Sequence, residues 1–325
     1  MPKKIITFIF AFVLINALCV GTYVKIITDK YENLKVSEVA KSISVKTQNM
    51  NHKFYLYEQN VINFRTEAKE YYKLKNKDFG EDITIANLED FPSADGGGIW
   101  FEPYKFNHKQ KENCIYASWQ NDKAKIDDYY FKPEYNYLNQ SWYTQIKSEI
   151  KSPTQVVWTK PYKDKNGTGN IMITAGTGIF DKGTLVGLVT IDAYFDELVK
   201  MCNEIQPSMD SKILLGSIQN DYVIRDAGDK QNAIIQSYDK DLSNYIKNEP
   251  QKGKIAVNDI DYDGIKYVSF ATILDNGFFL AVNIPRNEIF EKTDLYNTIA
   301  IALLLIVSLS SAGALAYFIL KCINE

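Results

Sequence analysis

The segments Tyr135-Asn-Tyr-Leu-Asn-Gln-Ser-Trp-Tyr143 and Trp158-Thr-Lys-Pro-Tyr-Lys-Asp164 precede a strand-like run, Gly187-Leu-Val-Thr-Ile-Asp192. Together they bring aromatic side chains and two carboxylates into one part of the chain. Aromatic faces attract a desolvated cation, and carboxylates supply the counter-charge that the cation loses on leaving water. This stretch therefore predicts a cage for a small ammonium group.

Short apolar runs separated by turn residues surround the stretch, which predicts antiparallel strands. Strands are expected at 99–104 after a glycine break at 96–98, and at 115–119, 156–158, 171–174 and 185–191, with turns at Asn166-Gly167 and 181–183. Helices are expected at 142–150 and 193–205, whereas the part that follows Gly80 is expected to hold strands and turns. Residues 80–205 are thus predicted to form an α+β module.

A second, smaller module is predicted at 206–290. Its expected strands are 212–218, 222–224, 260–262, 265–272 and 277–284, with turns at Asn220-Asp221 and Asp263-Gly264 and a helix at 242–246. The fold class is therefore α+β, with two antiparallel-sheet modules in succession.

Residues 25–75 contain neither proline nor glycine and predict one long helix. The apolar residues recur mostly at spacings of three, four or seven, as one face of a helix requires; they are Leu34, Val36, Val39, Ile43, Met50, Phe54, Val61 and Phe64. Such a helix would pack along the rest of the domain, or pair with its copy in a homodimer.

Two uncharged apolar runs, 5–24 and 297–320, are predicted to be transmembrane helices, because ~20 residues at ~1.5 Å each cross a hydrocarbon core of ~30 Å. A cleaved signal peptide is the alternative for the first run, but the run is long and lacks a small-residue cleavage pattern. Lys3, Lys4 and Lys321 flank the outer ends of the runs. The positive-inside rule then places both termini, including a stub at 321–325, in the cytoplasm and residues 25–296 outside the cell membrane.

The charge balance, 37 Lys and Arg against 40 Asp and Glu, gives no indication of nucleic-acid binding. Cys114 and Cys202 would share the external compartment, either as a disulfide or as two buried thiols. His52 and His108 are far apart in the sequence. We therefore expect no metal site, no cofactor and no catalytic triad.

Five motifs taken in order resemble the double Cache (dCache) domain, the extracellular sensor module of bacterial chemoreceptors and sensor kinases. They are Gly97-Gly-Ile-Trp-Phe-Glu-Pro-Tyr104, Trp142-Tyr143, Trp158-x-x-Pro161-Tyr162-x-Asp164, Gly187-Leu-Val-Thr-Ile-Asp192 and Asn276-Gly-Phe-Phe-Leu-Ala-Val-Asn-Ile-Pro285. The resemblance covers residues 25–290. It implies two PAS-like modules on a long signalling helix, with the ligand held in the membrane-distal module, 80–205, rather than in the membrane-proximal one, 206–290.

The amino-acid-binding subset of that family has the pattern Tyr-x4-Arg-x-Trp-Tyr, then Tyr-x-Asp, then a lone Asp. This sequence is similar at Tyr135, Trp142, Tyr143, Tyr162, Asp164 and Asp192, but Gln140 occupies the arginine position. In the subset, the arginine and the tryptophan hold the ligand carboxylate, and the tyrosines and aspartates hold its ammonium group. The resemblance therefore implies a site that is complete for the amine and altered for the carboxylate.

A neutral glutamine donates hydrogen bonds to a carboxylate but adds no charge, and no arginine lies between Gly80 and Asp192. A lysine such as Lys160 is the alternative partner. The first hypothesis is accordingly a sensor for an amine without a free α-carboxylate. An ordinary amino acid comes second, and a purine or another polar ring stacked on the aromatic side chains comes third.

Receptors of this family usually continue past the second span into an output domain, whereas this sequence has five residues after Leu320. We expect either a separate kinase or chemoreceptor partner, a truncated receptor, or a protein that sequesters its ligand. An extracellular hydrolase that uses Asp164 and Asp192 as an acid–base pair is a weaker alternative, as is a structural or adhesive ectodomain. No enzymatic activity is predicted.

Overall fold

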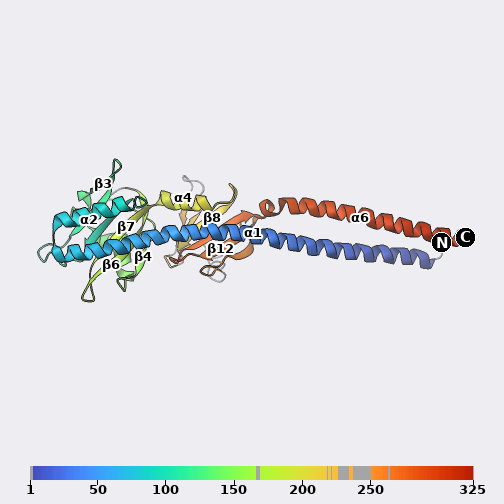
Figure 1. The fold of residues 1–325 in the computed structure, drawn as a ribbon, viewed down its shortest axis with the longest axis horizontal. Helices are drawn as coiled ribbons and strands as arrows, with labels where there is room; N and C mark the ends of the chain where they lie inside the picture. Colours follow the sequence, from blue (N-terminus) through green and yellow to red (C-terminus); the bar gives the residue numbers. More distant parts are fainter. Residues whose placement is uncertain are drawn as a thin grey trace. The chain divides into compact units, whose positions relative to one another are not determined.

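The structure is a computed structural model that describes residues 3–165, 169–217, 219–220, 222–225, 234–236, 250–262 and 264–324 (Figure 1). The expected helix at 242–246 lies outside these residues, as do the Asn166-Gly167 turn and the turn residues Asp221 and Asp263. The chain divides into a larger compact unit, Ser44–Ala256 with Ser269–Asn283, and a smaller one, Met1–Ile43 with Val257–Val268 and Ile284–Glu325.

The larger unit contains a seven-stranded antiparallel sheet in the order β3-β2-β1-β7-β6-β4, with β5 paired to β6. Its strands are β1 Gly96–Phe101, β2 Cys114–Gln120, β3 Lys123–Ile126, β4 Val156–Trp158, β5 Tyr162–Lys163, β6 Ile171–Asp181 and β7 Thr184–Tyr194. The long β6–β7 hairpin is central, and its turn holds Gly183 at a φ of 81°, which glycine adopts without steric cost. The expected α+β fold is confirmed.

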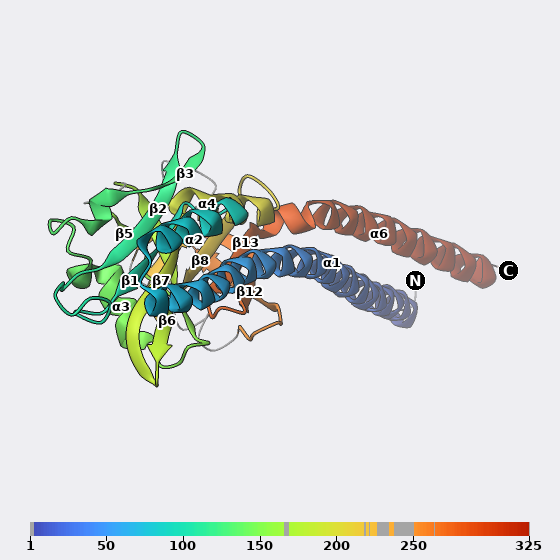
Figure 2. The same cartoon turned by 60° about the vertical axis from the view of Figure 1, so that its left-hand side comes forward.

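Helices cover both faces of this sheet. The last part of α1 (Lys3–Leu74) and α2 (Lys77–Asp90) lie along one face, as Figure 2 shows. The short helices η1 (Asp128–Phe131), η2 (Tyr137–Asn139) and α3 (Ser141–Glu149) belong to the opposite face, where Ile146 of α3 packs on Gly176 of β6. Side chains alternate between the faces of a strand, so every second residue of β1, β2, β6 and β7 faces α3.

The helix α2 replaces the strands and turns that the sequence predicted after Gly80. Asn76 caps it, since its side chain accepts a hydrogen bond from the Phe79 amide at 3.3 Å. Gly80 is buried inside the helix, and a β-carbon there would come within 2.5 Å of the Tyr71 ring. This glycine therefore allows close packing of α2 on α1 and does not end a helix, which is why the sequence-based prediction was wrong here.

The second sheet has the order β10-β9-β8-β13-β12-β11. Its strands are β8 Lys212–Ser217, β9 Tyr222–Arg225, β10 Ile234–Gln236, β11 Ala256–Tyr262, β12 Ile265–Ile273 and β13 Phe279–Pro285. The sequence predicted five of these and missed β10. The helix α4 (Phe195–Ile205) precedes this sheet in the chain, and Lys53 of α1 forms an ion pair with Glu204 of α4 at 2.8 Å.

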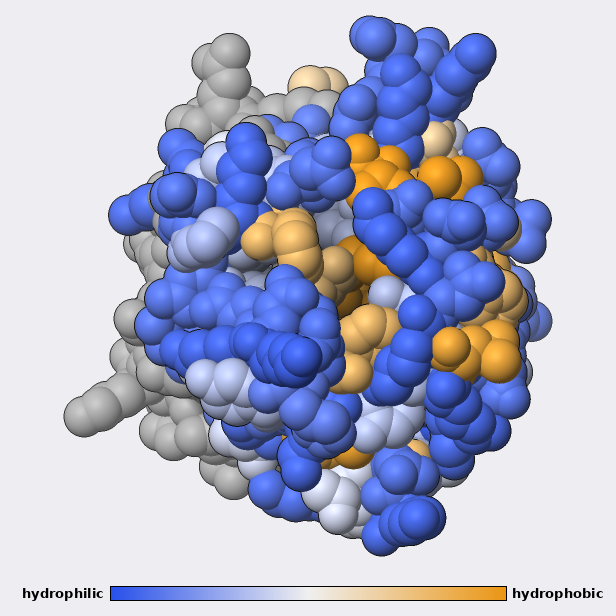
Figure 3. Space-filling view, turned by 90° about the vertical axis from the view of Figure 1, so that its left-hand side faces the viewer, coloured by the Kyte–Doolittle hydropathy of each residue, from blue (hydrophilic) through white to orange (hydrophobic). Residues whose placement is uncertain are grey.

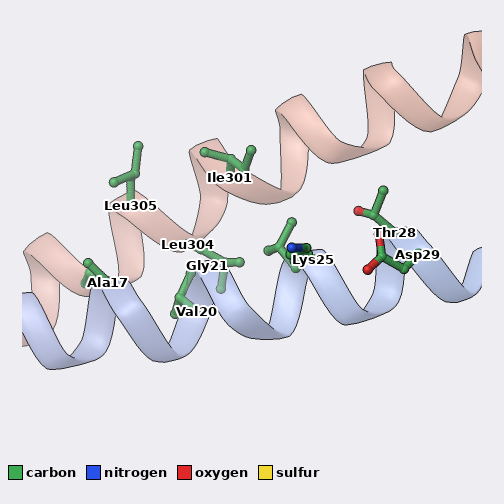
Figure 4. A pocket seen from close by; sticks show the side chains of 11 residues that line it. Ala17, Val20, Gly21, Lys25, Thr28, Asp29, Ile301, Leu304 and Leu305 are labelled. Atoms are coloured by element: carbon green, nitrogen blue, oxygen red, sulfur yellow. The ribbon is translucent and has the colours of Figure 1, made fainter.

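The smaller unit joins the first part of α1 to α6 (Arg286–Asn324). Arg286 connects its elements through ion pairs to Glu32 of α1 at 2.9 Å and to Asp259 of β11 at 3.1 Å. Both helices include stretches long and apolar enough to cross a membrane. An apolar groove of about 380 Å³ separates them, with Gly21 of α1 facing Leu304 of α6 (Figure 4).

The external cysteines form no disulfide. Cys114 and Cys202 are both free and buried. Burial raises the pKa of the Cys202 thiol to about 12, which keeps it protonated and unreactive. Of the two alternatives, buried thiols are therefore the correct one.

Candidate ligand-binding site

Asp192 lies near the end of β7 on the face of the sheet that α3 covers. In the strand register it stands opposite Gly96 on β1 and opposite Thr174 on β6. The Thr174 hydroxyl donates to Asp192 Oδ1 at 2.5 Å, and the Tyr116 hydroxyl donates to Oδ2 at 2.8 Å. Asp192 is only 4% exposed, so two neutral hydroxyl groups hold a carboxylate that is almost fully removed from water.

Glycines in β1 make the Tyr116 hydrogen bond possible. Tyr116 pairs with Gly98, and a β-carbon on Gly98 would come within 2.7 Å of the Ile115 carbonyl oxygen. A β-carbon on Gly96 would collide with the Tyr116 hydroxyl group. The tyrosine ring therefore crosses β1 where the strand has no side chains. The sequence predicted a glycine break before a strand, whereas Gly96–Phe101 is one continuous strand.

Asp164 follows β5 and is held in the same way by two tyrosines. The Tyr130 hydroxyl donates to Asp164 Oδ2 at 2.6 Å, and the Tyr135 hydroxyl donates to Oδ1 at 3.4 Å. The Trp142 indole N–H donates to the Tyr135 oxygen at 3.3 Å. Asp164 is also 4% exposed, and the Tyr135 hydroxyl links it to Trp142.

Trp100 of β1 lies at the centre of the aromatic rings around the two carboxylates. Its ring centroid is 4.8 Å from that of Trp142, 5.7 Å from that of Tyr116 and 6.3 Å from that of Tyr135. The indole N–H donates to the Thr190 hydroxyl at 2.7 Å, so the polar edge of Trp100 is satisfied. The rings can offer their faces to a cation without leaving a buried donor unpaired.

Burial controls the protonation of Asp192. Desolvation raises its pKa to about 7, nearby Asp164 and Asp95 add to the rise, and the hydrogen bonds from Thr174 and Tyr116 oppose it. No lysine or arginine among the described residues forms an ion pair with Asp192. A cation that enters the cluster would therefore supply the missing counter-charge.

The phenols around the carboxylates remain hydrogen-bond donors. Burial, followed by the negative charge of Asp192, raises the pKa of Tyr116 and of Tyr162 well above the usual value. Tyr162 shares a hydrogen bond of 2.7 Å with the Thr174 hydroxyl, which places it one step from Asp192. A neutral phenol can donate a hydrogen bond to a carboxylate and turn its oxygen or its ring towards an ammonium group.

The structure brings five of the seven predicted site residues into one network: Tyr135, Trp142, Tyr162, Asp164 and Asp192. Gln140 and Tyr143 point elsewhere. The Gln140 amide donates to the Tyr135 backbone carbonyl at 2.6 Å. The Tyr143 hydroxyl donates to Glu102 Oε1 at 2.6 Å, beside an ion pair between Lys147 and Glu102.

Trp158 and Lys160 lie outside the network. Trp158 packs against Phe54 and Tyr57 of α1, with its indole N–H donating to Glu58 at 3.0 Å, so it belongs to the interface with the long helix. Lys160 is exposed, and its backbone amide donates to Gln145 Oε1 at 3.0 Å.

Sequence reasoning missed four residues of the cluster: Trp100, Tyr116, Tyr130 and Thr174. Tyr116 and Thr174 lie inside predicted strands and reach Asp192 only through the register of β2, β1, β7 and β6. The sequence signal that could have placed Tyr116 is the alternation of side chains between the two faces of a strand, which puts Tyr116 on the same face as Cys114 and Ser118. Among the described residues, no group of three His, Cys, Asp or Glu side chains is arranged to hold a metal ion.

Comparison with known proteins agrees with this architecture. Residues 80–200 match the family model described as methyl-accepting chemotaxis protein-like, first PDC sensor domain. The chain carries a Cache-type sensor domain. It is also 25% identical over 194 residues to the methyl-accepting chemotaxis protein McpC of Bacillus subtilis, an alignment that covers 60% of this chain and 27% of McpC. The chain thus spans about a quarter of that relative's length.

Solved structures share the fold at low sequence identity. The extracellular domain of mmHK1S-Z3, described as a histidine kinase, has a TM-score of 0.64 at 16% identity and covers 80% of this chain and 98% of its own. The ligand-binding domain of the Campylobacter jejuni chemoreceptor Tlp3, solved with L-valine, has a TM-score of 0.55 at 11% identity and covers 81% and 97%. The fold that these structures share therefore extends over most of this chain.

Proposed function

We propose that this chain is the sensing part of a membrane receptor and that it binds a small amine between Asp164 and Asp192. The observation that carries this proposal is the carboxylate of Asp192, which is 4% exposed, is held by the hydroxyl groups of Thr174 and Tyr116, and lies within a shell of aromatic rings that also contains Asp164. Buried carboxylates are costly unless a cation or a proton compensates them. The ammonium group of a ligand fills that role.

Ligand binding would replace the proton on Asp192 by the positive charge of the ligand's ammonium group. Near neutral pH the raised pKa of Asp192, about 7, lets it retain a proton in the ligand-free protein. An ammonium group that binds between the carboxylates replaces this proton and donates hydrogen bonds to ionised Asp192. The hydroxyl groups of Tyr116 and Tyr130 then either stay on the carboxylates or turn aside for the ligand.

Gln140 is the basis for preferring an amine to an amino acid. Its amide is bonded to the Tyr135 carbonyl, and it carries no charge to offset a ligand carboxylate. Losing the charge partner of a buried group typically costs ~2–5 kcal/mol, roughly a thirty-fold to several-thousand-fold loss of affinity. An ordinary amino acid is the second candidate, because the structures similar to this one include the Tlp3 domain solved with L-valine.

Calorimetric titration of the full chain in detergent micelles tests whether the ligand is an amine or an amino acid. Isobutylamine and valine form one matched pair, and phenethylamine and phenylalanine form another; each pair differs only by the carboxylate. We expect each amine to bind at least ten times more tightly than its amino acid. Tighter binding of either amino acid would overturn the amine assignment.

An Asp192→Asn variant tests the location of the site. It keeps the size of the side chain and removes its charge, and we expect amine affinity to fall at least a hundred-fold. Asp122→Asn is the matched control, since Asp122 is an exposed residue of the β2–β3 turn. Equal losses in both variants, or none in Asp192→Asn, would place the ligand elsewhere.

We further propose a two-pass receptor with residues 25–296 outside the cell and both termini in the cytoplasm, on the basis of Lys3, Lys4 and Lys321 beside the apolar runs. A separate kinase or chemoreceptor would read the ligand state through the spans. A ligand shifts such an equilibrium only by its difference in affinity for two states. Co-purification of the detergent-solubilised chain with a kinase or a chemoreceptor would support this assignment, and recovery of the chain alone would count against it.

A further inference from the structure

A second pocket opens at the end of the larger unit where α1 finishes and α2 begins. Its volume is about 280 Å³. The face of the molecule that carries this turn is hollowed, with apolar side chains inside a hydrophilic rim (Figure 3). Cys114, Ile115 and Tyr71 belong to the inner wall and are buried, whereas Lys75 and Asp128 are exposed.

Among the described residues that line this pocket, Lys75 is the one lysine without an ion pair. Lys77 pairs with Glu81 at 2.9 Å, and Asp127 Oδ1 accepts the Tyr129 amide at 3.0 Å. Lys75 forms no ion pair with any described residue.

Aromatic rings fix the position of the Lys75 ammonium group. Its nitrogen is 3.6 Å from the centroid of the Tyr72 ring and 4.1 Å from that of Phe106. Ring faces attract the cation but accept its N–H groups only weakly. Partial burial lowers the pKa of Lys75 to about 8, and the negative charge of Asp181 opposes this shift only in part.

We propose that this pocket binds a small monocarboxylate with an apolar body. The carboxylate pairs with Lys75 at the rim, and the apolar body lies against Ile115 and the Tyr71 ring. A monocarboxylate brings one negative charge to the lysine that lacks an ion pair among the described residues, whereas a phosphate dianion brings two to a pocket that Asp127 and Asp128 also line. Repulsion by these carboxylates therefore opposes the dianion more strongly than the monoanion.

This site is distinct from the proposed amine site. Asp192 and Asp164 do not line the pocket, and Tyr116 is the residue that the two have in common. The two sites also demand opposite ligand charges: the first compensates an ammonium group with carboxylates, and the second compensates a carboxylate with an ammonium group. The inference therefore does not depend on the identity of the ligand at Asp192.

The test is calorimetric titration of the full chain in detergent micelles with 3-phenylpropionate and with its neutral amide. We expect the acid to bind at least ten times more tightly than the amide. Lys75→Gln should remove this preference, and Lys75→Arg should restore it, because arginine keeps the charge. Lys73→Gln is the matched control, since Lys73 is in the last turn of α1, two residues before Lys75, is paired with Glu70 at 3.0 Å and does not line the pocket.

Two results would overturn the proposal. One is failure of the unmodified chain to bind 3-phenylpropionate, or equal affinity for the acid and the amide. The other is an Asp192→Asn variant that loses 3-phenylpropionate as fully as Lys75→Gln does, which would assign the ligand to the first site. The second site is supported independently of the first if Asp192→Asn changes the affinity for 3-phenylpropionate by less than threefold and Lys75→Gln abolishes its binding.

Discussion

In the ligand-free protein, two features of Asp192 have opposite effects on its pKa: its burial, and the hydrogen-bond donors around it that are suited to an anion. The donors from Thr174 and Tyr116 favour the ionised form, while desolvation favours the neutral form and prevails, so the pKa rises to about 7. A residue with this balance changes its charge when a cation arrives. We therefore expect proton release and ligand binding to be linked at this position.

The first prediction is that amine affinity depends on pH through Asp192. An alkylamine stays protonated below about pH 9, so the affinity should rise as Asp192 ionises. Below about pH 7 the affinity should fall towards ten-fold per pH unit, and titrations between pH 5 and 8 would measure the slope. Asp192→Asn should flatten it, whereas a slope that survives in this variant would assign the linkage to another group, such as Asp95, whose pKa burial raises to about 6.

The ligand-free protein should show the opposite trend in stability. The pKa of Asp192 is about 7 in the folded chain against 3.8 as the ordinary value, and burial also raises that of Asp95 to about 6. Between about pH 4 and 7 the folded state holds protons that the unfolded state has released, so the free energy of unfolding falls as the pH rises. Urea unfolding of the full chain in micelles at several pH values measures this fall, and a saturating amine should reduce it. Stability that increases over the same interval would contradict the raised pKa values.

Tyr116 permits a matched prediction on a single hydroxyl group. Tyr116→Phe removes the 2.8 Å hydrogen bond to Asp192. Hydrogen bonds to charged groups contribute ~1.5–3 kcal/mol, so amine affinity at neutral pH should fall roughly ten-fold to a hundred-fold, as titration calorimetry would measure. Tyr104→Phe, at a tyrosine that is 51% exposed, should have no effect. An unchanged affinity in Tyr116→Phe would mean that this phenol leaves Asp192 when the ligand binds.

At the level of elements, the packing of β1 depends on glycines, whose lack of a β-carbon leaves room for the Tyr116 ring. Gly96→Ala places a methyl group where the Tyr116 hydroxyl lies, and overpacking of this kind typically costs ~1–3 kcal/mol. We expect a lower melting temperature together with weaker amine binding, because the displaced hydroxyl is the one that holds Asp192. Adding Tyr116→Phe should recover part of the stability but not the affinity. Full independence of the two changes in a double-mutant cycle would refute the contact.

The elements that the sequence predicted well are those whose signal is local. Absence of glycine and proline over 25–75 and a regular apolar spacing predicted most of α1, and Asp181-Lys-Gly183 predicted the β6–β7 turn. The glycines Gly80, Gly96 and Gly98 misled the prediction, because each allows a close approach between elements distant in sequence. Their role depends on Tyr71 and Tyr116, which no local pattern connects to them.

The candidate site divides in the same way. Both carboxylates and Tyr135, Trp142 and Tyr162 could be proposed from sequence. Tyr116 and Thr174 could not, since they become neighbours of Asp192 only when β2, β1, β7 and β6 assume their register. Gln140 and Tyr143 were predicted from position in a motif, but their side-chain ends bond to the Tyr135 carbonyl and to Glu102.

For the whole molecule, α1 carries a row of apolar side chains that the described residues leave exposed. Ile27, Leu34, Val45 and Leu56 are 49%, 56%, 54% and 41% exposed. They are separated by 7, 11 and 11 residues, counting from 27 to 34, 45 and 56, and spacings of 7 and 11 return to the same side of a helix. Ile43 and Val61, on the opposite side, are buried. We infer that the row is the surface through which two copies of the receptor pair.

Cysteine cross-linking provides the last prediction. In a chain whose Cys19 and Cys322 are changed to serine, Val45→Cys should form a disulfide-linked dimer under mild oxidation in membranes, because equivalent residues on a two-fold helix pair face each other. Lys109→Cys, at an exposed loop position that is not part of the apolar row, is the control and should remain monomeric on a non-reducing gel. Equal cross-linking of both variants would indicate random collision, and cross-linking of neither would exclude α1 as the dimer interface. If the spans respond to ligand, a saturating amine should also change the rate at which the Val45→Cys dimer forms, while Asp192→Asn should abolish that change.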